Sequence, residues 1–201
     1  MYAVKVLKPG YSKWLGPNRQ QADGTVSLVK GDRNIIVDTG SPWDRDFIVE
    51  ALRNEGLSPE DINYVVCTHG HSDHIGNLNL FRNAIHIVSY DIAEKDVYTF
   101  HPFASGIPFK IDLEVQVIPT PGHGSEDISV IVRTKDGIVA IVGDLFESID
   151  DLGNDEIWKA FSKFPEKQRQ SREFILKVAD FIVPGHGHMF RNLRASESSR
   201  A

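Results

Sequence analysis

The sequence predicts a single α/β domain over residues 1–201, with residues 195–201 as a flexible tail. Runs of β-branched and aromatic residues of strand length alternate with helix-like segments, an order that is typical of α/β folds. A chain of 201 residues that is 41% hydrophobic can bury a core without disulfides.

Short β-branched runs between turn residues predict the strands of this domain. We expect strands at residues 4–7, 25–29, 35–37, 63–67, 84–89, 113–118, 128–132, 138–142 and 181–183. Lys-Gly-Asp-Arg-Asn at 30–34 and Lys-Asp-Gly at 135–137 predict hairpin turns. The segment 91–108 has no regular pattern, and we expect an irregular loop there, which either walls a substrate pocket or only packs against the domain.

Apolar residues at helical spacing predict three main helices, over residues 42–54, around Trp158, and from Pro165 to about residue 180. The residues expected on their inward faces include Phe47, Ile48, Ala51, Leu52, Phe174, Ile175 and Val178. Ile75, Leu78 and Phe81 predict a further helix after residue 74. Trp14, Trp43 and Phe103 are expected to be exposed and to contact a partner subunit or a substrate.

The segment Thr-His-Gly-His-Ser-Asp-His at 68–74 places three imidazoles and one carboxylate within six residues of chain. His69 and His71 are two residues apart, so they reach the same side only from extended or loop backbone. Imidazole and carboxylate ligands suit zinc and its first-row neighbours, whereas calcium is bound mostly by oxygen. The segment therefore predicts a metal site after strand 63–67. A histidine-rich surface loop is the alternative.

Further histidines and aspartates follow later strands, and strand ends on one edge of a sheet converge in space. The candidate metal ligands are His69, His71, Asp73, His74, His123, Asp144 and His186. Seven ligands are too many for one tetrahedral zinc and suit a two-metal site. Asp38 also follows a strand, and the sequence leaves open whether it serves the ligands or caps its own turn.

The chain contains four motifs in the order H-x-H-x-D-H, P-G-H-G, G-D and P-G-H-G. With these motifs in this order, the sequence resembles the metallo-β-lactamase superfamily over nearly the whole chain. The resemblance implies a four-layer αββα sandwich, in which two mixed sheets pack face to face between outer helices. It implies one metal on His69, His71 and His123, a second on Asp73, His74 and His186, and Asp144 on both. Asp144 stands where the best-known β-lactamases have cysteine, which is similar to the glyoxalase II and ribonuclease Z branches.

The sequence resembles one branch of the superfamily in more detail, in residues 39–43, 68–77, 143–147 and 184–190. That resemblance implies a homodimeric endoribonuclease of the cytosol, or of the nucleus, which cleaves histone pre-mRNA 3′ ends. It implies two Zn²⁺ per chain, with Fe or Mn as substitutes. The alternatives are a glyoxalase II-like hydrolase of thioesters, lactones or other small acyl substrates, a mono-iron persulfide dioxygenase, and a binding module without catalysis.

A solvent molecule shared by two cations loses a proton near neutral pH and becomes a nucleophile. Asp73 is expected to orient that nucleophile. His188 and Glu147 are the candidates for proton delivery to the leaving group, with a structural role as the alternative for each.

Charge and cysteine content restrict the partners and the compartment. With 22 Lys and Arg against 28 Asp and Glu, the net charge is −6, which gives no overall attraction for nucleic acid. The most basic stretch is the C-terminal third, where Arg169 and Arg172 lie on a solvated helix face or a phosphate-binding surface. The single cysteine, Cys67, favours a reducing cytosol. No apolar run approaches the roughly 20 residues of a membrane span, so we expect no membrane association.

Overall fold

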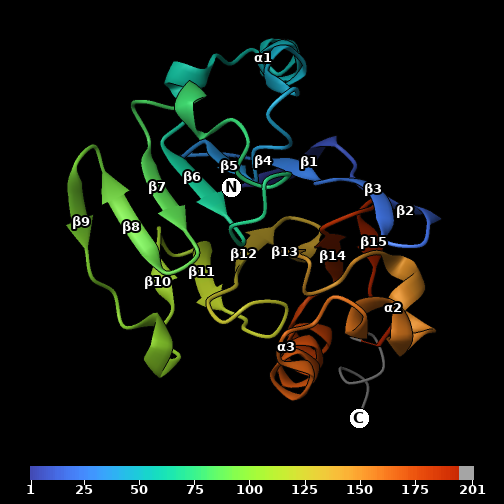
Figure 1. The fold of residues 1–201 in the computed structure, drawn as a ribbon. Helices are drawn as coiled ribbons and strands as arrows, with labels where there is room; N and C mark the ends of the chain where they lie inside the picture. The colour runs from blue at the N-terminus through green and yellow to red at the C-terminus, as the bar shows by residue number, and fades with distance from the viewer. Residues whose placement is uncertain (195–201) are drawn as a thin grey trace.

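The computed structural model describes residues 1–194, which form two large β-sheets between outer helices (Figure 1). The first sheet has seven strands in the order β1-β4-β5-β6-β7-β8-β9, and the second has six in the order β10 to β15. Together with the helices on the outer faces, this arrangement confirms the expected αββα sandwich. The predicted tail at 195–201 lies outside the described residues.

The strands and helices have the following bounds. The first sheet contains β1 (Ala3–Lys8), β4 (Val26–Lys30), β5 (Ile35–Val37), β6 (Tyr64–Cys67), β7 (Ile85–Val88), β8 (Asp91–Glu94) and β9 (Val97–Thr99). The second contains β10 (Phe109–Lys110), β11 (Val115–Pro119), β12 (Ile128–Thr134), β13 (Gly137–Gly143), β14 (Phe181–Pro184) and β15 (Phe190–Arg191). A separate hairpin contains β2 (Tyr11–Gly16) and β3 (Arg19–Asp23), and the helices are α1 (Arg45–Asn54), α2 (Asp155–Lys159) and α3 (Pro165–Val178).

Alternation along the strands produces the layers, because successive side chains point to opposite faces of a sheet. In β5, Ile35 and Val37 join the core between the two sheets, whereas Ile36 packs toward α1. In β13, Ile141 joins the same inter-sheet core, and Ala140 packs toward α3. Both faces of each sheet are therefore buried near its centre.

The two sheets meet at the edge where β6 and β14 end. Ile128, at the start of β12, donates its backbone N–H to the Thr68 carbonyl at 2.9 Å. Thr25 donates its backbone N–H to the Gly185 carbonyl at 2.7 Å. Since β5 and β6 are parallel to each other, as are β13 and β14, several carboxyl ends of strands converge here.

The prediction of a helix after residue 74 is wrong. Apart from the single 3₁₀ turn at Leu78–Leu80, residues 75–81 form turns, and these turns are bonded to the loop before α1. Gly76 donates its N–H to the Gly40 carbonyl at 2.8 Å, and the Asn77 amide donates to the carbonyls of Thr39 and Ser41. These tertiary hydrogen bonds replace the intrahelical ones.

The irregular loop expected at 91–108 is wrong in its first part, because β8 and β9 form a hairpin there, whereas residues 100–108 contain no strand and one 3₁₀ turn, at Phe103–Ser105. The charged, half-exposed residues of this hairpin lack the apolar alternation by which strands are found in a sequence. The expected pocket wall is present, because Asp91, Ala93, Lys95 and Tyr98 line a cavity of about 440 Å³. Phe103, which we expected to be exposed, is 1% exposed and fills the inter-sheet core. Phe47 and Phe174, expected to face inward, are about half exposed, because Ile48 and Ile175 occupy the buried sides of their helices.

None of the helices in the described part of the chain is long and apolar enough to cross a membrane.

Ile87, which is fully buried between the sheets, tests this core. Ile87→Ala should lower the free energy of unfolding by about 2–5 kcal/mol, because it removes buried apolar atoms and leaves a cavity. The same substitution at Ile149, which is 53% exposed, should change it by less than about 0.5 kcal/mol. Urea denaturation of both variants measures this difference, and equal losses would contradict the assigned core.

Candidate metal centre

All seven predicted ligands come together at the edge where the two sheets meet. His69, His71, Asp73 and His74 follow β6, His123 follows β11, Asp144 follows β13, and His186 follows β14. They form two groups whose donor atoms lie within 4.8 Å of one another, namely His69, His71, His123 and Asp144, and Asp73, His74 and His186.

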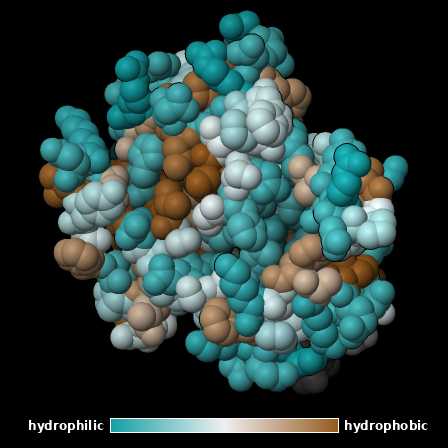
Figure 2. Space-filling view, viewed as in Figure 1, coloured by the Kyte–Doolittle hydropathy of each residue, from teal (hydrophilic) through white to brown (hydrophobic). Residues whose placement is uncertain are grey.

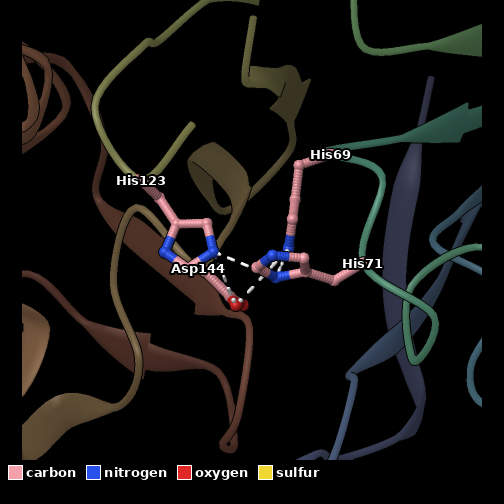
Figure 3. A group of neighbouring side chains, drawn as sticks. All are labelled: His69, His71, His123 and Asp144. Atoms are coloured by element: carbon pink, nitrogen blue, oxygen red, sulfur yellow. Dashed lines mark hydrogen bonds and ion pairs between the residues drawn. The ribbon is translucent and has the colours of Figure 1, made fainter. Parts of the chain in front are cut away.

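The first group contains three imidazoles and one carboxylate, which point toward a common centre (Figure 3). His71 Nδ1 lies 2.9 Å from His69 Nε2 and 3.2 Å from His123 Nε2. Asp144 Oδ2 lies 3.5 Å from the Nε2 atoms of both His69 and His123. The group has the nitrogen-rich composition of a zinc site.

The second group is reached by the other oxygen of the same carboxylate. Asp144 Oδ1 lies 3.2 Å from His74 Nε2 and 3.4 Å from His186 Nε2. Asp73 Oδ2 lies 4.0 Å and 3.9 Å from the same two nitrogens. Asp144 therefore directs one oxygen to each group, as a ligand shared by two metals would.

The donor atoms fit metal ions better than they fit one another. Within residues 1–194, His74 Nε2 and Asp144 Oδ1 are buried and have no hydrogen-bond partner. Buried polar atoms without partners are costly, and nitrogen and oxygen lone pairs aimed at one centre repel each other. A divalent cation at each group would bind these lone pairs, and the donor set of imidazoles and carboxylates is one that zinc accepts.

Burial and opposite charges shift the pKa values within the centre. Burial raises the pKa of Asp144, but the surrounding imidazoles, led by that of His74, hold it well below its usual range. Burial lowers the pKa of His123 to about 4 despite the nearby Asp144. The Asp144 carboxylate therefore stays ionised and the His123 ring stays neutral, which are the states required for binding a metal.

Neighbouring groups hold the ligand rings in place. His74 Nδ1 donates to Asp38 Oδ2 at 2.7 Å, and the other oxygen of Asp38 accepts from the Thr68 N–H at 2.7 Å. His186 Nδ1 donates to the Asp23 carbonyl at 3.0 Å. Each contact uses Nδ1 and leaves Nε2 facing the centre. Asp38 therefore holds a ligand ring, which is one of the two roles that the sequence left open. Nothing in the sequence indicated that the Asp23 carbonyl would hold the ring of His186.

The two predicted proton donors lie in different surroundings. His188 is exposed, and it belongs to neither ligand group. Glu147 is 4% exposed, and its Oε2 lies 3.9 Å from His186 Nε2. Burial, and then the nearby Asp144 carboxylate, raises the pKa of Glu147 to about 9. Only Glu147 is close enough to act at the centre in this arrangement.

A cavity of about 390 Å³ opens beside the second group. Its lining residues are Ser12, Trp14, Glu147, Ser148, Asp150, Asn154, Glu156, Ile157, Ala160, Phe161 and His186. Trp14, from the β2–β3 hairpin, stacks on Phe161 with ring centroids 5.9 Å apart. Figure 2 shows mainly hydrophilic surface along the middle of the molecule, between the two halves, and an apolar region over β6 and β7.

Comparison with known proteins agrees with this fold and centre. The family model described as the metallo-beta-lactamase superfamily matches residues 21–186. The chain belongs to the metallo-β-lactamase superfamily. Metallo-beta-lactamase domain-containing protein 1 of Xenopus laevis is 46% identical over 196 residues, which cover 96% of this chain and 83% of that protein.

Two solved structures share the fold. A candidate metallo-beta-lactamase from Thermotoga maritima is 24% identical with a TM-score of 0.70, and the match covers 94% of this chain and 99% of that one. A dizinc quorum-quenching lactonase, solved with a homoserine product, is 19% identical with a TM-score of 0.63. That match covers 84% of this chain and 73% of the lactonase.

Asp38→Asn tests whether the Asp38 carboxylate orients His74. We expect the affinity of the second group for zinc to fall by about 10–100-fold, because the ring loses its anionic partner. Competition with a chromophoric chelator measures that affinity. Asp96→Asn, which makes the same change at an exposed carboxylate, is the control. Equal affinities in the two variants would refute the orienting role.

Gly185→Ala tests how tightly the backbone confines Asp144. A Cβ atom at this position would lie 1.9 Å from Asp144 Oδ1, so the carboxylate would have to move away from both groups. We expect a loss of bound metal at both positions, measured by mass spectrometry of the metals in purified protein. Gly187→Ala is the matched control, because its nearest neighbour would be a Pro184 ring carbon at 3.3 Å. Full metal content in Gly185→Ala would refute this confinement.

Proposed function

We propose that this superfamily member is a hydrolase that works with two metal ions, most simply two Zn²⁺. The observation that carries the proposal is the position of Asp144, which directs one oxygen to each of two groups of buried ligands. The name of the dizinc lactonase with the same fold supports zinc. Fe and Mn are the alternatives, because imidazole and carboxylate also suit them.

The residues divide the work as follows. His69, His71 and His123 would hold one ion, Asp73, His74 and His186 the other, and Asp144 both. When bound, two such ions lower the pKa of solvent between them and stabilise negative charge on a substrate oxygen. The side chain of Asp73 keeps 20% of its surface exposed, more than the other ligands of its group. It is therefore placed to accept a hydrogen bond from the attacking solvent and to orient it.

The metal centre alone does not select the substrate, because acyl and phosphoryl transfer both develop negative charge on oxygen. The lining of the adjacent cavity favours the acyl alternative. Asp150 and Glu156 contribute carboxylates to it, and the net charge of the chain is −6. These charges repel a polyanion but accept a neutral ester, thioester or lactone. The printed name of the lactonase supports the same class.

Cleavage of RNA is the second candidate, and it rests on the detailed resemblance to one branch of the superfamily. The predicted basic surface offers it little support, because the Arg172 guanidinium is buried against Asp151 at 3.1 Å. Arg169 remains exposed but pairs with Asp155. Homodimer assembly and a location in the cytosol or nucleus stay predictions of the resemblance.

The first experiment is metal analysis of the natively purified protein together with Asp144→Ala. We expect about two zinc ions per chain in the wild type, and in the variant fewer ions and a loss of activity of about 100-fold or more. Asp136→Ala, at an exposed turn, is the control. One iron per chain with oxygen consumption would instead support the persulfide dioxygenase.

The same preparations decide the substrate class. Wild-type protein should hydrolyse an acyl-homoserine lactone or an acyl-glutathione thioester, and Asp144→Ala should not. Cleavage of single-stranded RNA, abolished by Asp144→Ala, with no acyl activity would establish the ribonuclease and refute the acyl proposal.

A further inference from the structure

Glu147 is a buried carboxylate beside the metal centre that neither ligand group contains. It lies three residues after Asp144, in the loop that follows β13. The residue is 4% exposed, and among residues 1–194 its Oε1 atom has no hydrogen-bond partner. A buried carboxylate oxygen without a partner is costly, so its position calls for a ligand.

The geometry around Glu147 is that of a third ligand group. A donor atom from each of Asp144, Glu147 and His186 lies within 4.8 Å of the other two. Oε2 of Glu147 lies 3.9 Å from His186 Nε2, the same distance that separates this nitrogen from Asp73 Oδ2. Glu147 is therefore as close to His186 as a residue already assigned to the second metal.

The backbone of Glu147 is fixed on both sides, which keeps its side chain at the centre. Its N–H donates to Asp151 Oδ2 at 2.8 Å, and its carbonyl accepts from the His186 N–H at 2.8 Å. Asp151 is itself held by the buried Arg172 guanidinium. The hydrogen bond from the His186 N–H also ties the loop of Glu147 directly to a metal ligand.

We propose that Glu147 is a further oxygen ligand of the second metal. This inference rests on the proposed two-metal centre. The second site would then contain three carboxylates, Asp73, Asp144 and Glu147, with the imidazoles of His74 and His186. The first has three imidazoles and one carboxylate. Because carboxylates suit harder cations, the second site takes Mn²⁺ well, whereas the first keeps the zinc preference of an imidazole-rich site.

The proposal also decides between two roles for Glu147. A carboxylate that binds a metal is ionised and has no proton to deliver, so a ligand role excludes the proton-donor role predicted from the sequence. The two roles differ in what they do to metal binding, which can be measured without substrate.

The test is a titration of metal-free protein, loaded first with one equivalent of Zn²⁺ and then with Mn²⁺, followed by electron paramagnetic resonance. In the wild type we expect one Mn²⁺ to bind at the second site. Glu147→Gln, which keeps the shape but removes the charge, should weaken Mn²⁺ binding by about tenfold or more and leave the first equivalent of zinc in place. Glu147→Asp, which restores a carboxylate on a shorter side chain, should recover part of the affinity.

Glu156→Gln is the matched control, because it removes a carboxylate from the same cavity wall at an exposed side chain. Equal Mn²⁺ affinity in wild type, Glu147→Gln and Glu147→Asp would overturn the ligand role, and so would an equal loss in Glu156→Gln, which would indicate a general effect of charge. Wild-type protein that binds no second metal of any kind would refute the two-metal centre itself. The failure of this inference is thus distinct from the failure of the proposed function.

Discussion

The position of the Asp144 carboxylate is the constraint on which the rest of the centre depends. One of its oxygens lies 3.5 Å from two imidazole nitrogens of the first group, and the other lies 3.2–3.4 Å from two imidazole nitrogens of the second. It keeps this position because the surrounding backbone leaves it no other space. Gly143 turns the chain with a φ of 53°, and Gly185 lets the end of β14 pass so close that a side chain there would meet Asp144. The protein therefore fixes the shared ligand before any metal binds.

Both sheets are needed to surround that carboxylate. The first sheet contributes the H-x-H-x-D-H loop after β6, and the second contributes the loops after β11, β13 and β14. Packing between the sheets buries apolar side chains. The free energy gained by this burial offsets the cost of bringing the lone pairs of the ligands together. A cation that binds only the folded arrangement stabilises it by mass action. Metal binding and folding would therefore be thermodynamically linked in this protein.

The sequence predicted which side chains converge because their signal is local, whereas it predicted tertiary contacts poorly. Histidines after strand-like runs are visible without any structure, and all seven converge. The helix expected over Ile75, Leu78 and Phe81 fails because Asn77 bonds to the loop before α1, a contact between segments about 36 residues apart. The burial of Glu147 likewise depends on Asp151 and Arg172, which lie on other elements. Spacing along the chain does not encode such contacts.

The charge of the occupied centre links the ligand set to the choice of substrate. With two divalent cations bound, Asp73, Asp144 and the attacking hydroxide would leave about one positive charge, and a third carboxylate from Glu147 would leave the centre about neutral. Attack of hydroxide on a neutral ester or thioester moves its one negative charge onto the substrate oxygen, so the total charge of centre and substrate stays the same. A phosphodiester brings one further negative charge to the centre, so it needs a more positive centre or cationic side chains nearby. Around this cavity the nearby charged groups are carboxylates, with Lys159 paired to Glu156. A ligand role for Glu147 and a neutral acyl substrate therefore support each other on electrostatic grounds.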